Sequence, residues 1–180
     1  MSRVNQFSRR RFAVAAVSTA ATAVLPDVSR ADTTTQNVQG NAVTSLTPYL
    51  LFDGNCHQAM EFYRTTFGGQ LTVMKVKDSR ARDHMPSDQF EKIINARLTS
   101  GKVEISASDW LRPDRKRTQG NTVCLYLSGG TPEELKVLFE RLSQGGDVTD
   151  PMTEQFFGIY GALNDRFGVR WMFRAATNGW

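Results

Sequence analysis

An internal repeat of strand, helix, strand and hairpin restricts the fold of this chain more than any other feature of its sequence. The string Gly68-Gly69-Gln70-Leu71-Thr72 is matched by Gly145-Gly146-Asp147-Val148-Thr149 at an offset of 77 residues, and Gly101 is matched by Gly168 at an offset of 67. The smaller second offset indicates an insertion in the first copy, for which the polar segment 78–89 is the simplest place. We therefore predict an α+β domain of two βαβββ modules, since each module leaves an apolar sheet face that the other helps to cover.

Each copy shows the same order of predicted elements. In the first copy a strand, a helix capped by Asn55, a second strand and a hairpin are predicted over residues 46–52, 55–67, 71–76, 93–99 and 102–108. In the second copy a strand over 122–128 precedes a helix that begins with the capping box Thr131-Pro132-Glu133-Glu134. A strand through Val148 and a hairpin that turns at 165–168 complete the copy.

The first 31 residues are typical of an export signal. A twin arginine in Ser8-Arg9-Arg10-Arg11-Phe12 precedes the apolar stretch 13–25, and Ser29-Arg30-Ala31 has small residues where a signal peptidase cuts. The pattern resembles the bacterial twin-arginine (Tat) motif and predicts a periplasmic or secreted protein. An uncleaved N-terminal anchor is the alternative, although this thirteen-residue stretch falls short of the roughly 20 residues that span a bilayer. Residues 32–44 are predicted to be a flexible linker, and 45–175 the folded domain.

The basic character of the chain belongs to this signal. Of 22 Lys and Arg and 18 Asp and Glu, residues 1–31 contain five arginines and one aspartate, which leaves 17 basic and 17 acidic residues. A nucleic-acid partner needs a basic stripe, and none remains; we interpret the basic cluster at 112–117 as a solvated loop. No membrane contact is expected after cleavage. Two cysteines exclude a disulfide scaffold and a Cys-rich zinc module.

Several strings resemble the PhnB-like branch of the vicinal oxygen chelate superfamily, which includes glyoxalases, bleomycin-resistance proteins and ring-cleaving dioxygenases. These strings are PYLLFDGNC at 48–56, AMEFY at 59–63, FGG at 67–69, QGGDV at 144–148, FG at 157–158 and DRFGVRWM at 165–172. The resemblance implies that the strands curl into a cup of mixed sheet, with helices outside and the ligand inside. Members commonly dimerise through their sheets, so a homodimer is one expected assembly.

Alternation along the strands then predicts which side chains line the cup. The predicted ligand-binding residues are Thr47, Tyr49, Asn95, Arg97, Glu104, Ser106, Thr122, Tyr126, Phe157, Tyr160 and Met172. Glu104 and Arg97 are the candidate catalytic pair, a carboxylate base beside an anion-holding guanidinium; the alternative for them is a structural salt bridge.

The resemblance also identifies where a metal would be held. Members that use a divalent ion take His, Gln or Glu ligands from positions that correspond here to Thr47, Glu104 or Ser106, Thr122 and Met172. Only Glu104 is a good ligand among these, so no cofactor is expected; a site with one divalent ion, assisted by His84, is the alternative. His57 is interpreted as a surface helix residue and Cys56 and Cys124 as structural, with a disulfide between the two cysteines left as an alternative.

The sequence therefore predicts an exported glyoxalase-like protein that binds or sequesters a small molecule without a metal ion. A metal-dependent lyase, isomerase or dioxygenase is one alternative, and a structural partner in an exported assembly is another. The residues do not decide whether the domain catalyses a reaction. A methyltransferase is excluded by the absence of a glycine-rich loop that leaves a strand to cradle a nucleotide, because both glycine pairs close helices.

Overall fold

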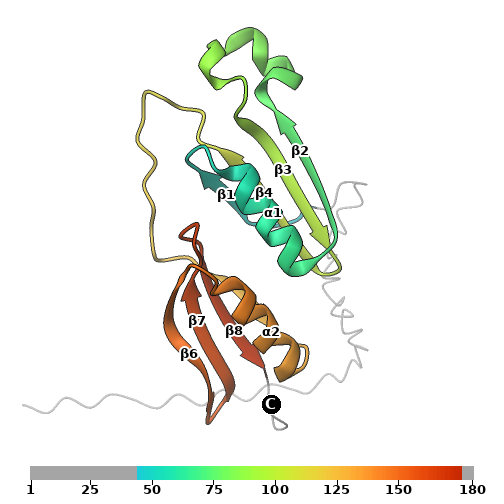
Figure 1. Cartoon of the computed structure of the whole chain (residues 1–180), viewed down its shortest axis with the longest axis vertical. Coiled ribbons are helices and arrows are strands. Elements are labelled where there is room, and N and C mark those ends of the chain that lie inside the picture. The colour runs from blue at the N-terminus through green and yellow to red at the C-terminus, as the bar shows by residue number, and fades with distance from the viewer. Residues whose placement is uncertain (1–43, 176–180) are drawn as a thin grey trace, which may run out of the picture. The chain divides into compact units, whose positions relative to one another are not determined.

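The computed structural model describes residues 44–175, which form two successive βαβββ modules (Figure 1). The first module contains β1 (Tyr49–Phe52), α1 (Cys56–Phe67), β2 (Gln70–Lys75), β3 (Ile93–Ser100) and β4 (Val103–Asp109). The second contains β5 (Leu125–Ser128), α2 (Pro132–Leu142), β6 (Asp147–Gln155), β7 (Gly158–Asn164) and β8 (Arg170–Ala175). The predicted export signal, and the predicted linker as far as Val43, lie outside the described residues.

Each module builds one four-stranded mixed sheet, in the orders β1-β4-β3-β2 and β5-β8-β7-β6. In both sheets the first strand runs parallel to the fourth, and the remaining pairs are antiparallel. Helix α1 packs on β3 and β4, and α2 packs on β7 and β8, so each helix covers one face of its own sheet (Figure 1). The predicted α+β class with two βαβββ modules is confirmed.

The two glycine pairs have the same structural role in each module. Gly68 is the C-cap of α1 and Gly145 lies in the turn three residues after α2, and they take positive φ angles of 73° and 70°, a conformation that glycine adopts without strain. A Cβ on Gly69 would overlap the backbone oxygen of Thr99, and a Cβ on Gly146 would overlap that of Asn164. Both pairs therefore lie in the turn between a helix and the next strand, and they let that strand approach a neighbouring strand closely.

The two helices begin differently. In α2 the predicted capping box is present: Glu134 N–H donates to Thr131 Oγ1 at 3.1 Å, and Thr131 N–H donates to Glu134 Oε2 at 2.9 Å. In α1 Asn55 occupies the predicted capping position, but its side chain makes no cap. The buried carboxylate of Asp109, at the end of β4, replaces it by accepting the Cys56 N–H at 2.9 Å.

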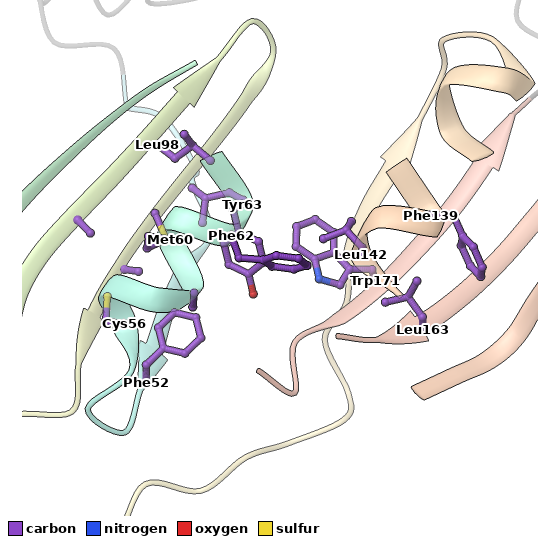
Figure 2. Close-up of a cluster of buried hydrophobic side chains, with 14 of the residues drawn as sticks. Phe52, Cys56, Met60, Phe62, Tyr63, Leu98, Phe139, Leu142, Leu163 and Trp171 are labelled. Atoms are coloured by element: carbon purple, nitrogen blue, oxygen red, sulfur yellow. The ribbon is translucent and has the colours of Figure 1, made fainter. Parts of the chain in front are cut away.

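The core continues from one module into the other. Figure 2 shows Tyr63 of α1 beside Trp171 of β8, two fully buried rings whose centroids lie 5.6 Å apart. Both donate to Oδ2 of the buried Asp165, Tyr63 Oη at 2.7 Å and Trp171 Nε1 at 2.8 Å. Burial and the adjacent Asp165 raise the pKa of Tyr63, so its hydroxyl remains a donor. One carboxylate thus joins the two modules within their common core.

Three local predictions need correction. β1 begins at Tyr49 rather than at residue 46, and β5 begins at Leu125, so Thr122 lies in a bend before the strand instead of on the sheet. The inserted segment 78–89 was expected as a loop, but it contains the short 3-10 helices Arg80–His84 and Ser87–Gln89, after a third at Val76–Asp78. Local hydrogen bonds such as Ser79 Oγ to the Val76 carbonyl, at 2.9 Å, give these turns their order.

Candidate functional site

The strands of each sheet have one face under a helix and one face open. Exposure alternates along β1, where Tyr49 and Leu51 are exposed and Phe52 is buried, and along β3, where Asn95, Arg97 and Thr99 are exposed. The strand register brings the open-face residues together, since Arg97 lies opposite Ser106, which lies opposite Tyr49. We call this side of the two sheets the open face.

A hydrogen-bonded cluster on the open face is centred on Glu104. Its Oε1 lies 2.8 Å from Arg97 Nη2 and accepts a hydrogen bond from Thr47 Oγ1 at 3.3 Å. The Glu104 side chain is 35% exposed and that of Arg97 is 56% exposed. Among residues 44–175 no partner bonds Glu104 Oε2, so one carboxylate oxygen is left for a bound molecule. Strand pairing explains the contact: Thr99 lies opposite Glu104, and Arg97 is two residues further along the same face.

A cavity of about 480 Å³ lies beside this cluster. Glu104 and Thr47 from the first module and Tyr126 from the second line it. Most of the remaining wall is apolar, and it includes Val103, Ile105, Val123, Leu125, Leu127 and Trp171. Lys102 also lines it, so the cavity combines one anionic and one cationic side chain with several apolar contacts, a mixture typical of small-molecule sites.

The predicted residues of the second sheet form a separate group. Tyr126 lies opposite Met172 in the pairing of β5 with β8, and Tyr160 lies opposite Arg174 in the pairing of β7 with β8. The Phe157 and Tyr160 rings are 6.0 Å apart, and Arg174 Nη2 donates to the Phe157 carbonyl at 3.3 Å. Of this group only Tyr126 lines the 480 Å³ cavity.

The predicted site residues thus fall into two sets on the open face, with one exception. Thr47, Glu104 and Tyr126 share the cavity, Arg97 is bonded to Glu104, and Tyr49, Asn95 and Ser106 lie on the adjoining strands. Thr122 is exposed in its bend and lines neither this cavity nor the sheet. The prediction did not include the apolar residues Val123, Leu125 and Leu127 of this wall, because alternation along the strand places Leu125 and Leu127 on the face opposite Tyr126.

The cysteines and histidines do not assemble a reactive group. Cys56 is fully buried, and burial, with the charge of Asp109, raises the pKa of its thiol to about 12. A thiol with so high a pKa is a poor nucleophile. Cys124 is half-buried, and both cysteines are free. His57 is exposed on α1, and His84 is exposed on a 3-10 helix of the inserted segment.

The positions at which the superfamily holds a metal do not fit one here. Thr47 offers a hydroxyl already bonded to Glu104, Met172 offers a thioether, and Thr122 lies off the sheet. Glu104 is the single carboxylate of this set, and Arg97 already neutralises it. Within residues 44–175 no group of three or more His, Cys, Asp and Glu side chains is arranged to hold a metal ion. A hydroxyl and a thioether are weak ligands for a divalent cation, so the donor set does not match such an ion.

A wider groove, of about 810 Å³, lies on the helix side of the domain. It is lined by Glu61 and Phe62 of α1, Arg141 of α2 and Arg166 of the β7–β8 turn, whose guanidinium lies 4.0 Å from the centroid of the Phe62 ring. No helix within the described part of the chain is long and apolar enough to cross a membrane.

Comparison with known proteins finds relatives over nearly the whole described region. The family model described as 3-demethylubiquinone-9 3-methyltransferase matches residues 44–173. Protein YjdN of Escherichia coli is 31% identical over 137 residues, which are 71% of this chain and 92% of that protein.

Two solved structures extend this comparison. Protein PA1353 of Pseudomonas aeruginosa is 33% identical, with a TM-score of 0.67 over 74% of this chain and 98% of that one. The PhnB protein of Bacillus cereus is 26% identical, with a TM-score of 0.60 over 74% of this chain and 100% of that one.

Proposed function

The chain belongs to the family described as 3-demethylubiquinone-9 3-methyltransferase, a PhnB-like branch of the vicinal oxygen chelate superfamily. From this premise we propose that it is an exported protein that binds a compact small molecule without a metal ion. The observation that carries the proposal is the Glu104 cluster beside the 480 Å³ cavity of the open face.

The contacts define the kind of ligand that fits. Glu104 Oε2 has a free lone pair for a ligand donor, and the half-exposed Arg97 beside it offers further N–H groups to a ligand acceptor. Tyr126 is 50% exposed at the same cavity and offers a flat surface for an aromatic ring. A planar aromatic molecule with neighbouring donor and acceptor groups therefore matches the site.

The binding test uses a neutral probe, 4-hydroxybenzamide, which has an aromatic ring, a hydroxyl donor and an amide acceptor. Glu104→Gln keeps the shape of the side chain but removes its charge, and we expect it to raise the Kd at least tenfold, a loss of about 1.4 kcal/mol. Glu61→Gln is the matched control, because Glu61 is also paired with an arginine at 2.8 Å but lies on α1. Equal affinities of the two variants, or no saturable binding, would overturn the proposal.

Metal content separates this proposal from the metal-dependent lyase, isomerase or dioxygenase. Elemental analysis of the protein, purified without chelators or a His-tag, is expected to find no stoichiometric transition metal, since only Glu104 among the corresponding positions is a good ligand. About one metal ion per chain, lost in Glu104→Gln, would instead establish the metal-dependent alternative.

The methyltransferase activity in the family's description is not part of the proposal. The glycine pairs at 68–69 and 145–146 form the turns between each helix and the next strand and allow close strand contacts, so they are committed to the fold rather than to a nucleotide. Titration with S-adenosylmethionine is expected to give no heat of binding; saturable binding would contradict this part.

Export by the twin-arginine route is proposed from the sequence pattern of residues 8–31. Replacement of Arg9 and Arg10 by lysine is expected to retain the protein in the cytoplasm in a fractionation experiment, and unchanged export would refute the route. The homodimer stays a prediction.

A further inference from the structure

A second cavity, of about 510 Å³, lies where the segment between the two modules passes along β1 and the start of β8. Its wall includes Tyr49 and Leu51 of β1, Lys116, Arg117 and Val123 of the connecting segment, and Arg170 of β8. The two cavities share the wall formed by Val123, Cys124 and Leu125, whereas Glu104 and Thr47 line only the first.

The lining of this cavity carries positive charge alone. Lys116, Arg117 and Arg170 contribute to it, and no aspartate or glutamate does. Elsewhere in the described chain Lys75, Lys77, Arg64, Arg97 and Arg115 are each paired with a carboxylate. None of the three cavity cations has such a partner among residues 44–175. An anion that entered the cavity would meet unneutralised charge.

Arg117 gives a second, independent indication. Its Nε atom is buried, the residue as a whole is half-buried, and Nε has no hydrogen-bond partner among the described residues. Buried donors in folded proteins are nearly always bonded, so a donor without a protein partner points to an external acceptor. A guanidinium is also the side chain best shaped to hold a carboxylate or phosphate with two parallel hydrogen bonds.

Specific contacts fix the wall that carries these cations. Gln119 Nε2 donates to the Gly168 carbonyl at 2.6 Å, and Gly168 has a φ of 79°, with no room for a Cβ beside Gln119. Trp110 Nε1 donates to the Arg115 carbonyl at 2.7 Å, which holds the start of the segment. These contacts hold the backbone that carries Lys116 and Arg117 in place before a ligand binds, which lowers the entropy cost of binding.

The remaining wall is apolar and partly open. Tyr49, Leu51 and Val123 line the cavity and are exposed, at 50%, 40% and 77%. We infer that this cavity is a second binding site, for a compact organic oxyanion whose carboxylate or phosphate group pairs with Arg117 and Arg170 and whose apolar body lies on Tyr49, Leu51 and Val123.

Isothermal titration with benzoate, phenyl phosphate and the neutral benzamide tests this site, and it is carried out on Glu104→Gln so that binding of benzamide in the first cavity does not contribute. At least one of the two anions is expected to bind saturably and benzamide at least tenfold more weakly, and the comparison of the anions identifies the preferred oxyanion. Higher ionic strength is expected to weaken the binding, because the contact is between charges. Binding of none of the probes, or equal binding of benzamide, would overturn the inference.

Variants locate the bound anion. Arg117→Gln and Arg170→Gln are each expected to raise the Kd of the bound anion at least tenfold, and Arg117→Lys to raise it less. Arg115→Gln is the matched control, because Arg115 is two residues away, is 69% exposed and does not line the cavity. Equal effects of Arg117→Gln and Arg115→Gln would refute the assignment, provided that the melting temperatures of both variants match that of the parent.

The same titrations keep this site separate from the proposed function. Glu104→Gln is expected to weaken 4-hydroxybenzamide and leave the anion unaffected, while Arg117→Gln should do the reverse. If Glu104→Gln instead weakens the anion and Arg117→Gln does not, the second site is wrong and the open-face proposal stands.

Discussion

The buried carboxylate of Asp165 supplies the most demanding test of how the two modules hold together. It is 4% exposed and accepts four hydrogen bonds: from Tyr63 Oη and Trp171 Nε1 on Oδ2, at 2.7 and 2.8 Å, and from the Phe167 and Val169 N–H groups on Oδ1, at 2.9 and 3.0 Å. Asp165→Ala would leave the Tyr63 and Trp171 donors buried without an acceptor.

The magnitude follows from those two donors. Each unsatisfied buried donor costs about 1–3 kcal/mol, and a hydrogen bond to a charged group contributes about 1.5–3 kcal/mol. Removing the carboxylate also relieves the cost of burying its charge, so the terms do not simply add. We expect Asp165→Ala to lower the free energy of unfolding by about 3–5 kcal/mol, a large part of the 5–15 kcal/mol of an ordinary domain.

Two further variants separate the contacts. In Asp165→Asn the amide presents an NH₂ group to one pair of donors in either orientation, so we expect about half the loss. Tyr63→Phe removes one donor with almost no change of shape and should cost about 1 kcal/mol. In the double variant with Asp165→Ala this cost should largely disappear, since the hydroxyl would have no acceptor to lose.

Urea unfolding followed by far-UV circular dichroism measures each value. Asp114→Asn is the control, because that carboxylate is 68% exposed and its substitution should change stability by less than about 0.5 kcal/mol. A loss below about 1 kcal/mol for Asp165→Ala, or full additivity with Tyr63→Phe, would refute the conclusion that this carboxylate joins the modules.

Three other predictions use single positions. Iodoacetamide at pH 8 should label Cys124 and spare Cys56 until denaturant is added, because burial raises the pKa of Cys56 to about 12. Equal labelling rates of the two cysteines, measured by peptide mass spectrometry, would be inconsistent with this. Gly69→Ala should cost at least about 2 kcal/mol of unfolding free energy, since its Cβ would overlap backbone at a positive φ, whereas Gly120→Ala, with open space around it, should be nearly neutral. Hydrogen bonds from two lysines lower the pKa of Glu91 from 4.5 to about 2. The stabilising effect of Glu91 should therefore be present above pH 4.5 and fade towards pH 2. A difference in urea midpoint between the parent protein and Glu91→Gln that stays constant over this range would contradict the prediction.

Much of the architecture could be predicted from local sequence signals. The capping box at Thr131 and the cap at Gly68 were predicted correctly, because these motifs act within a few residues of the chain, whereas α2 ends at Leu142, three residues before the glycine expected to close it. The pairing of Arg97 with Glu104 was foreseeable as well, because the turn at 100–102 fixes the register of the hairpin. The start of β5 was misplaced, since the apolar and polar alternation continues into residues that make no ladder contacts.

The two buried aspartates show where local signals are insufficient. Asp109 and Asp165 resemble ordinary turn residues in the sequence, yet Asp109 caps a helix that begins 53 residues earlier, and Asp165 binds a tyrosine 102 residues away. Arg117 is similar: it lies in a basic cluster that predicted a solvated loop, and the fold places it in a cavity wall with a buried Nε. Burial of a charge depends on what the distant chain brings beside it, which no local pattern contains.

The sequence by itself determined the two modules, their helix ends and the open and covered faces of the strands, because periodicity, capping and glycine conformation are properties of neighbouring residues. Only the tertiary structure decided which side chains meet: the Asp165 contacts between the modules, the cavity shared by Glu104 and Tyr126, and the unpaired cations beside β1. Packing of the two modules brings these groups together across many residues of chain, so their chemistry arises from folding rather than from any local string.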